Sequence, residues 1–198
     1  QVFGAVPIPF ARVQREVLAL TTPLQGKVRT LENLLVEVAV HREEKKCIVF
    51  TNGCFDVLHA GHVQYLREAK ALGDVLIVAI NADAEVRRQK GEGRPIHTAA
   101  DRLEVLSELQ CVDYLLVFEE PTVENLLREI VPDKYVKGGD YSPQQVNEYP
   151  VVRELGIEMC IVSHKPGHSS RTIVQKIKEN TETKPVDVMA TSRRTQRA

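Results

Sequence analysis

The sequence predicts an α/β fold, in which a parallel sheet of about five strands is covered by helices on both faces. Between residue 47 and about residue 177, short apolar runs rich in β-branched residues alternate with segments of helical spacing. Strands that alternate with helices form parallel sheets, because each return connection between parallel strands must be long. The strand segments are almost wholly apolar, as expected for strands that are buried on both faces.

Five segments are predicted to be strands: residues 47–50, 75–80, 114–118, 135–136 and 159–162. The helices are predicted from apolar residues that recur every three or four positions. They cover residues 31–40, a stripe of Val63, Leu66 and Ala69 closed by Gly73, a stripe of Leu103, Leu106 and Leu109, residues 126–130 before Pro132, and a stripe of Ile173, Val174 and Ile177 opened by Ser169 or Ser170. Thr98 with Asp101 resembles a capping box at the start of the third of these helices.

Composition excludes several classes of protein. The chain has 198 residues, enough for one compact domain, and its 26 Lys and Arg against 27 Asp and Glu give a formal net charge of -1. A balanced charge argues against binding to nucleic acid or to an acidic membrane surface. Tryptophan is absent and aromatic residues are 5%, so stacking platforms for single strands are not expected. The longest apolar run, residues 75–80, is far shorter than a membrane span.

The cysteines and the two ends of the chain complete the predicted organisation. Cys47, Cys54, Cys111 and Cys160 form no C-x-x-C pair, which favours free thiols in a reducing cytoplasm. Residues 1–27 contain three prolines and no clean period and are predicted to be an extension or linker, with no signal peptide. The functional domain is expected over residues 28–180. Residues 181–198 are polar and are predicted to form a disordered tail.

The segment from Thr51 to His62 is the first candidate for chemistry, since it follows a predicted strand and leads into a predicted helix. His59 and His62 are three residues apart, so they lie on one face of the first helical turn, beside backbone N–H groups that attract phosphate. Gly61 allows a phosphate to approach the backbone closely. Two other interpretations remain open: His59 caps the turn while His62 packs on the sheet, or the pair binds zinc, although no third ligand is near in sequence.

This segment, T-N-G-C-F-D-V-L-H-A-G-H, resembles the H-x-G-H signature of the nucleotidyltransferase superfamily, in its cytidylyltransferase-like branch. The resemblance continues through N-A-D at residues 81–83, K-G-E-G-R-P at 90–95, Arg102, V-K-G-G-D-Y at 136–141 and G-H-S-S at 167–170. The ordered set is similar to the heptose 1-phosphate adenylyltransferases, which occur alone or fused to a heptose kinase. The resemblance covers roughly residues 26–177 and implies a Rossmann-like fold.

The resemblance implies a nucleotidyl transfer in the cytoplasm for lipopolysaccharide synthesis. In this reaction D-glycero-β-D-manno-heptose 1-phosphate attacks the α-phosphorus of ATP in line, with Mg²⁺, and gives ADP-heptose and pyrophosphate. The attacking phosphate is already an anion near neutral pH, so catalysis requires positioning and charge neutralisation rather than a strong base. A homodimer and a separate or fused heptose kinase are implied partners. The alternatives are a cytidylyltransferase acting on glycerol 3-phosphate or a similar small phosphate, and a non-catalytic nucleotide-binding regulatory module.

The resemblance also implies roles for individual residues. His59, His62 and Lys90 are the expected catalytic residues, with Lys90 reaching over the phosphates from a glycine-rich loop. Acceptor contacts are expected from Asp56, Arg94, Arg102 and Tyr141. Two of these residues have an alternative: Asp56 orients its own loop, or Arg102 forms a helix-surface ion pair. Asp140 is the one protein candidate for a metal contact. Nucleotide contacts are expected from Asn52, Gly53, Cys54, Phe55, Gly61, Lys137, Gly138, Gly139, Asp140, Ser169 and Ser170. The chain departs from the family pattern at residues 169–171, which read S-S-R where related enzymes carry S-T-T.

Overall fold

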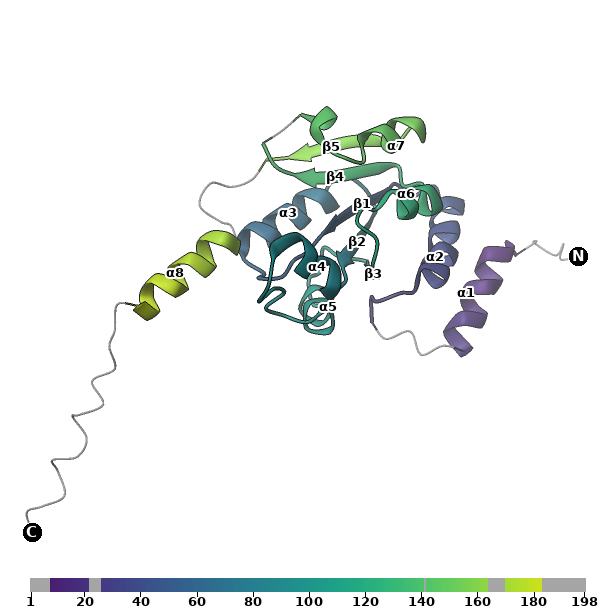
Figure 1. The fold of residues 1–198 in the computed structure, drawn as a ribbon. Helices are drawn as coiled ribbons and strands as arrows, with labels where there is room; N and C mark the ends of the chain where they lie inside the picture. The colour runs from purple at the N-terminus through teal and green to yellow at the C-terminus, as the bar shows by residue number, and fades with distance from the viewer. Residues whose placement is uncertain (1–7, 22–25, 141, 164–169, 183–198) are drawn as a thin grey trace, which may run out of the picture.

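The computed structural model describes residues 8–21, 26–140, 142–163 and 170–182 (Figure 1). One sheet of five strands forms its centre, in the order β3-β2-β1-β4-β5, and every neighbouring pair is parallel. The strands are β1 (Ile48–Gly53), β2 (Val75–Asn81), β3 (Tyr114–Phe118), β4 (Lys134–Gly138) and β5 (Glu158–Val162). The predicted α/β fold and all five predicted strands are therefore confirmed.

The strands send alternate side chains into two separate cores. Phe50 of β1 packs on the face covered by α2 (Leu31–Glu43), α6 (Glu124–Ile130) and α7 (Tyr149–Glu154). Its neighbour Val49 packs on the opposite face, against α3 (Ala60–Lys70) and α5 (Ala99–Ser107). Successive side chains of a strand point to opposite faces, so both residues are fully buried only if both faces are covered. The predicted three-layer arrangement follows from this pattern.

The strand order places a switch point between β1 and β4. From β1 the chain builds outward through β2 and β3, then returns to the other side of β1 to form β4 and β5. The connections that leave two neighbouring strands in opposite directions open a crevice at their carboxyl ends, which is where open α/β sheets bind ligands. Asn52 and Gly53 end β1, and Lys137 and Gly138 end β4, so residues of two predicted motifs meet at this crevice.

The amino ends of the strands are fastened by aspartates that sequence analysis did not single out. Asp74 Oδ2 accepts the Cys47 backbone N–H at 2.8 Å, and Asp133 Oδ2 accepts that of Ile48 at 2.7 Å. Asp113 Oδ2 accepts the Leu76 N–H at 2.6 Å. These carboxylates satisfy backbone donors at the edge opposite the crevice.

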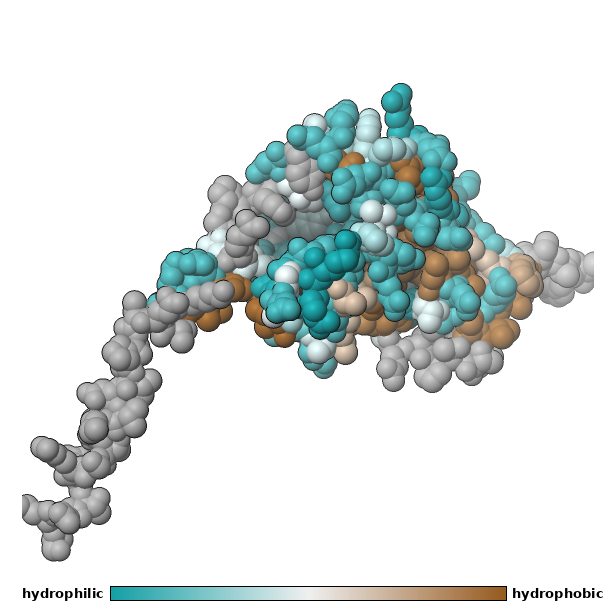
Figure 2. Space-filling model, in the orientation of Figure 1, coloured by the Kyte–Doolittle hydropathy of each residue, from teal (hydrophilic) through white to brown (hydrophobic). Residues whose placement is uncertain are grey.

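Three of the helices in the described residues were not predicted. The helix α1 (Phe10–Thr21) lies within the predicted extension, α4 (Asp83–Lys90) follows β2, and α7 precedes β5. The helices α4 and α7 have 8 and 6 residues, too few for a clear apolar period. The helix α1 packs on α2 and leaves large apolar side chains exposed, seen as the brown surface at the right of Figure 2; they include Phe10, Val13 and Val17.

The remaining predicted helices are present, and the start of α5 confirms its capping box. Thr98 Oγ1 accepts the Asp101 backbone N–H, and the Asp101 carboxylate accepts the Thr98 N–H. The helix α8 (Ser170–Glu182) matches the last predicted helix. Most of the predicted tail, residues 183–198, lies outside the described residues. Within the described residues, no helix is long and apolar enough to cross a membrane.

The packing predicts that Gly73→Ala destabilises the protein. A Cβ at residue 73 would lie 2.6 Å from Val49 Cγ2 and 2.8 Å from the Cys47 carbonyl oxygen, so β1 would have to move. We expect the free energy of unfolding in urea to fall by about 1–3 kcal/mol. Ala71→Ser is the control, since it also adds one heavy atom, at an exposed position in the same turn. Equal stability of the two variants would contradict the packing described here.

Candidate functional site

A polar cavity lies at the carboxyl edge of the sheet. It has a volume of about 580 Å³, and the hollow near the centre of Figure 2 has mainly hydrophilic residues around it. The ends of β1, β2 and β4, the helix α4 and residues 145–148 contribute to its wall. The structure brings together here four residues predicted to bind nucleotide: Asn52, Gly53, Cys54 and Lys137.

The two histidines of the H-x-G-H segment form a stacked pair at the start of α3. Their ring centroids are 3.8 Å apart, with an angle of 26° between the ring planes. His59 is the N-cap residue and His62 is the third residue of the helix; the His59 side chain makes no capping hydrogen bond. The first turn of a helix has backbone N–H groups without intrahelical partners, and the helix dipole adds partial positive charge. The pair and the helix terminus therefore offer several donors to one anionic group.

The Phe55 ring packs against the ring of His62. Its backbone is in the left-handed region, with φ of 47°, and its buried ring lies 5.3 Å from the His62 ring in an edge-on contact. A Cβ on Gly53 would come within 3.0 Å of the same ring, so a glycine is needed there. In this structure Phe55 packs against a catalytic candidate, which favours a positioning role over the predicted nucleotide contact.

The start of α8 lies against the loop that leads to the histidines. Ser170 Oγ donates a hydrogen bond of 3.1 Å to the Val57 carbonyl oxygen. The first turn of α8 therefore lies near the loop that leads into α3. Two other predicted site residues, Ser169 and Tyr141, lie outside the described residues.

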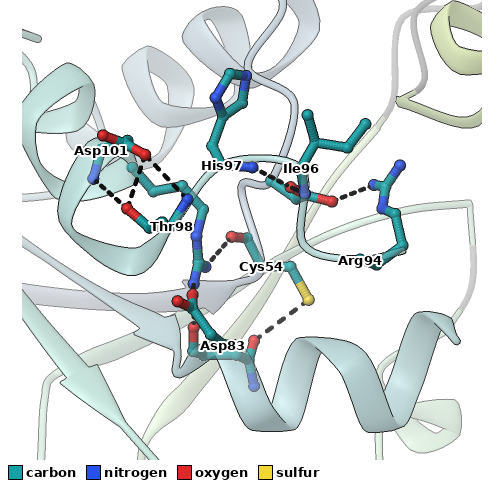
Figure 3. A network of polar contacts seen from close by, with 10 residues as sticks. Cys54, Asp83, Arg94, Ile96, His97, Thr98 and Asp101 are labelled. Carbon is teal, nitrogen blue, oxygen red and sulfur yellow. Dashed lines mark hydrogen bonds and ion pairs between the residues drawn. The ribbon is translucent and has the colours of Figure 1, made fainter. Parts of the chain in front are cut away.

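Asp56 braces the loop after α4. Its side chain is fully buried, and its Oδ1 accepts the backbone N–H groups of Ile96 at 2.6 Å and His97 at 3.2 Å. Arg94 forms an ion pair with the other carboxylate oxygen, and Figure 3 shows Arg94, Ile96 and His97 gathered at this point. Because these protein groups occupy the carboxylate, the arrangement favours loop orientation over the predicted acceptor contact for Asp56, and it engages one nitrogen of Arg94.

Arg102 joins the ends of two strands from inside the protein. Its side chain is 1% exposed; Nη1 donates to the Cys54 carbonyl oxygen at 2.6 Å, and Nη2 donates to the Asn81 carbonyl oxygen at 2.8 Å. Nη2 also forms an ion pair of 2.7 Å with Asp83 at the start of α4. Figure 3 shows Cys54 and Asp83 close together in this network. This arrangement favours a bracing role over the predicted phosphate contact, and it differs from the surface ion pair considered as the alternative.

Lys137 and the exposed Arg88 are the two cations among the described residues that line the cavity, and Lys137 is the less exposed of the two. Its Nζ donates to the Asn52 Oδ1 at 3.1 Å and lies 5.7 Å from the centre of the Tyr135 ring. Burial lowers the pKa of Lys137, and the charge of Glu148 acts in the opposite direction. The Tyr135 hydroxyl also donates to Asn52 Oδ1, at 2.7 Å. The amide oxygen of Asn52 is therefore held by two donors, and its amide group keeps a fixed orientation in the cavity wall.

Three other predicted residues, Lys90, Gly139 and Asp140, are not among the residues that line the cavity. Lys90 is exposed and is the last residue of α4, so its expected place in a loop is corrected; the loop begins at Gly91. Burial raises the pKa of the Cys54 thiol, and the positive charge of Lys90 acts to lower it. After β4, the backbone N–H of Gly139 donates to the Val162 carbonyl oxygen at 3.0 Å, and Asp140 is exposed.

Sequence analysis missed several residues that line the cavity, among them Gln89, Asn147 and Glu148. Gln89 belongs to a helix that was not predicted. Asn147 and Glu148 lie between η1 (Pro143–Gln145) and α7, where no sequence pattern marked a functional segment. Only the fold brings these residues next to the ends of β1 and β2.

The Arg102 contacts predict a specific loss of stability. Arg102→Met removes three hydrogen bonds from a buried charged donor, so the free energy of unfolding is expected to fall by about 1.5–3 kcal/mol. Arg128→Met is the matched control, since it breaks an ion pair with Glu154 that is exposed on both sides and should change stability by less than about 1 kcal/mol. Urea denaturation measures both. If Arg102→Met proves as mild as Arg128→Met, the bracing role is refuted.

Comparisons with known proteins agree with this geometry. The sequence profile of the family described as "Cytidylyltransferase-like" matches residues 50–194. The "Bifunctional protein HldE" of Pseudomonas fluorescens (strain Pf0-1) is 51% identical over 150 residues, which are 76% of this chain and 32% of that protein. The protein of the same name from Helicobacter acinonychis (strain Sheeba) is 43% identical over 163 residues, which are 82% of this chain and 34% of that protein. The chain thus spans about a third of the length of these relatives.

A solved structure shows the same fold. It is described as the lipopolysaccharide core biosynthesis protein from Thermoplasma volcanium GSS1, is 32% identical, and gives a TM-score of 0.50 over 61% of this chain and 97% of that chain. The histidine pair at the start of α3, the crevice between β1 and β4, and the matched profile all point to one assignment: this chain belongs to the cytidylyltransferase-like family of nucleotidyltransferases.

Proposed function

We propose that this chain transfers AMP from ATP to D-glycero-β-D-manno-heptose 1-phosphate and releases pyrophosphate. The observation that carries the proposal is the stacked pair of His59 and His62, which lies at the N-terminus of α3 just after the central strand β1. A polyphosphate at this point meets ring donors and backbone donors together. The similarity to bifunctional HldE proteins and to a lipopolysaccharide core biosynthesis protein supports the choice of acceptor.

The proposed reaction is a single displacement at phosphorus. An oxygen of the sugar phosphate forms a bond to the α-phosphorus of ATP while the bond to the bridging oxygen breaks, and pyrophosphate leaves with the electron pair. The attacking oxygen is already anionic near neutral pH, so no protein group has to remove a proton. His59 and His62 stabilise the charge that develops on the phosphates, and the N-terminus of α3 adds fixed dipoles.

Mg²⁺ enters this scheme with the nucleotide. Among the described residues, no three His, Cys, Asp or Glu side chains converge as a set that could hold a metal ion. Mg²⁺ commonly keeps several waters and binds substrate phosphates together with one or two carboxylates. We therefore treat Mg²⁺–ATP as the substrate, with the exposed Asp140 as the candidate for a single protein contact.

Pyrophosphate release tests the proposal. The folded chain is supplied with Mg²⁺, heptose 1-phosphate and either ATP or CTP. Release with ATP alone is the expected result. Release with CTP alone would instead favour the alternative, a cytidylyltransferase. Glycerol 3-phosphate would then be the next acceptor to test. No release with either nucleotide would refute the proposal and favour a nucleotide-binding regulatory role.

The histidine pair gives the sharpest variant test. We expect His59→Asn and His62→Asn each to lower kcat by about 100- to 1,000-fold, the usual cost of removing one donor to a developing anion. The control is His97→Asn, since the His97 side chain is exposed and only its backbone N–H contacts Asp56. If His59→Asn and His62→Asn both keep a kcat as high as that of His97→Asn, the role of the two histidines as donors is contradicted.

The remaining implications of the family resemblance stay predictions. We propose a homodimer, a heptose kinase that is fused or encoded separately, and action in the cytoplasm. The chain covers about a third of the bifunctional relatives, which supports the kinase as a partner. Light scattering of the purified chain measures the oligomeric state, with twice the monomer mass expected.

A further inference from the structure

The cavity at the carboxyl edge of the sheet has the chemistry of a sugar site rather than of a nucleobase site. Its wall is built mainly from amide and charged side chains, and its larger apolar contributions come from Pro121 and Val146. No aromatic ring lies among the described residues that line it. Nucleobases bind on aromatic or broad apolar surfaces, whereas a polyhydroxylated ring needs many donors and acceptors. The volume of about 580 Å³ leaves room for a sugar phosphate.

Glu148 is the most unusual residue of this wall. It lines the cavity and is 6% exposed, yet within the described part of the chain its carboxylate has no hydrogen bond and no ion pair. Its carboxylate oxygens are not among the buried side-chain atoms that lack a partner, so they remain accessible at the cavity and can accept hydrogen bonds from a ligand there. Glu148 is the N-cap residue of α7, and its backbone carbonyl accepts the Val152 N–H at 3.0 Å, so the backbone position is fixed.

A second buried charge also lines the cavity. Lys137 has one hydrogen bond, to Asn52, for an ammonium group with three donors. Its charge interacts with that of Glu148, but the two groups form no ion pair within 4.0 Å. A ligand that carries both hydroxyl groups and an anion would supply hydrogen-bond donors to Glu148 and an acceptor to Lys137. A sugar phosphate has this combination.

We propose that this cavity binds the sugar of the acceptor, that Glu148 accepts hydrogen bonds from its hydroxyl groups, and that Lys137 contacts its phosphate. Gln89 from α4 and Asn147 beside Glu148 supply further amide groups at the wall. The proposal reassigns Asn52 and Lys137 from the nucleotide to the acceptor. It rests on the proposed function for the identity of the acceptor, but the role of the cavity is tested separately.

Glu148→Gln tests this proposal, since it keeps the shape of the side chain and removes its charge. We expect the KM for heptose 1-phosphate to rise by about 10- to 150-fold, as for a lost hydrogen bond to a charged group. The KM for ATP should stay unchanged. Glu129→Gln is the control, because Glu129 is exposed on α6 and does not line the cavity; both of its KM values should match the wild type.

Three readouts make the outcome decisive. A thermal melt shows that Glu148→Gln is folded, and Gln89→Ala, at an exposed position of α4, replaces it if it is not; a rise in acceptor KM of about 2- to 12-fold is then expected, as for a lost neutral hydrogen bond. Calorimetry with heptose 1-phosphate measures acceptor binding without turnover, and weaker binding by the variant supports the proposal. A rise in the KM for ATP instead, or no change in either KM, would overturn it. Absence of turnover in the wild type would refute the proposed function itself and is thus a distinguishable failure.

Discussion

The site depends on a buried guanidinium that joins the ends of the neighbouring strands β1 and β2. Arg102 donates to the backbone carbonyls of Cys54 and Asn81 and pairs with Asp83. A charge buried to 1% exposure is tolerated only where its donors find acceptors, so the three acceptors must stay where they are. Cys54 belongs to the loop that leads to His59, and Asp83 begins α4. One side chain thus couples the loop before the histidines to the helix that borders the cavity.

Asp56 is a second buried charge that fixes neighbouring chain segments through its hydrogen bonds. Asp56 collects the backbone N–H groups of Ile96 and His97 and the guanidinium of Arg94, and this fixes the chain between α4 and α5. These contacts hold the loops of the site in place through protein groups. The proposed transfer between two phosphates needs alignment and fixed donors more than proton chemistry, and a rigid site supplies both. The histidine pair lies at the N-terminus of α3, and the polar cavity lies at the carboxyl edge of the sheet.

The sequence predicted the parts of the fold that burial dictates. The five strands are apolar because both faces of the sheet are covered, and the helices α2, α3, α5, α6 and α8 carry apolar residues at helical spacing. The short helices α4 and α7 lack that signal. The pair of His59 and His62 was predicted because three residues of spacing place two side chains on one helical face. The sequence left two roles open for Asp56, and the role favoured here for Arg102 differs from those predicted, because their partners lie 40 and 48 residues away or come from another strand. No local pattern reveals such partners.

In the proposed reaction, nucleotidyl transfer occurs in one direct displacement, with the histidines as donors and not as nucleophiles. The stereochemistry at phosphorus distinguishes this reaction from a two-step path. The protein would be given heptose 1-phosphate and ATP that carries sulfur in one defined configuration at the α-phosphorus, and the configuration of the product would be determined by ³¹P NMR. Inversion is expected, because a single in-line attack inverts the centre. Retention would contradict it, since two displacements through a covalent nucleotidyl–histidine intermediate would then be required.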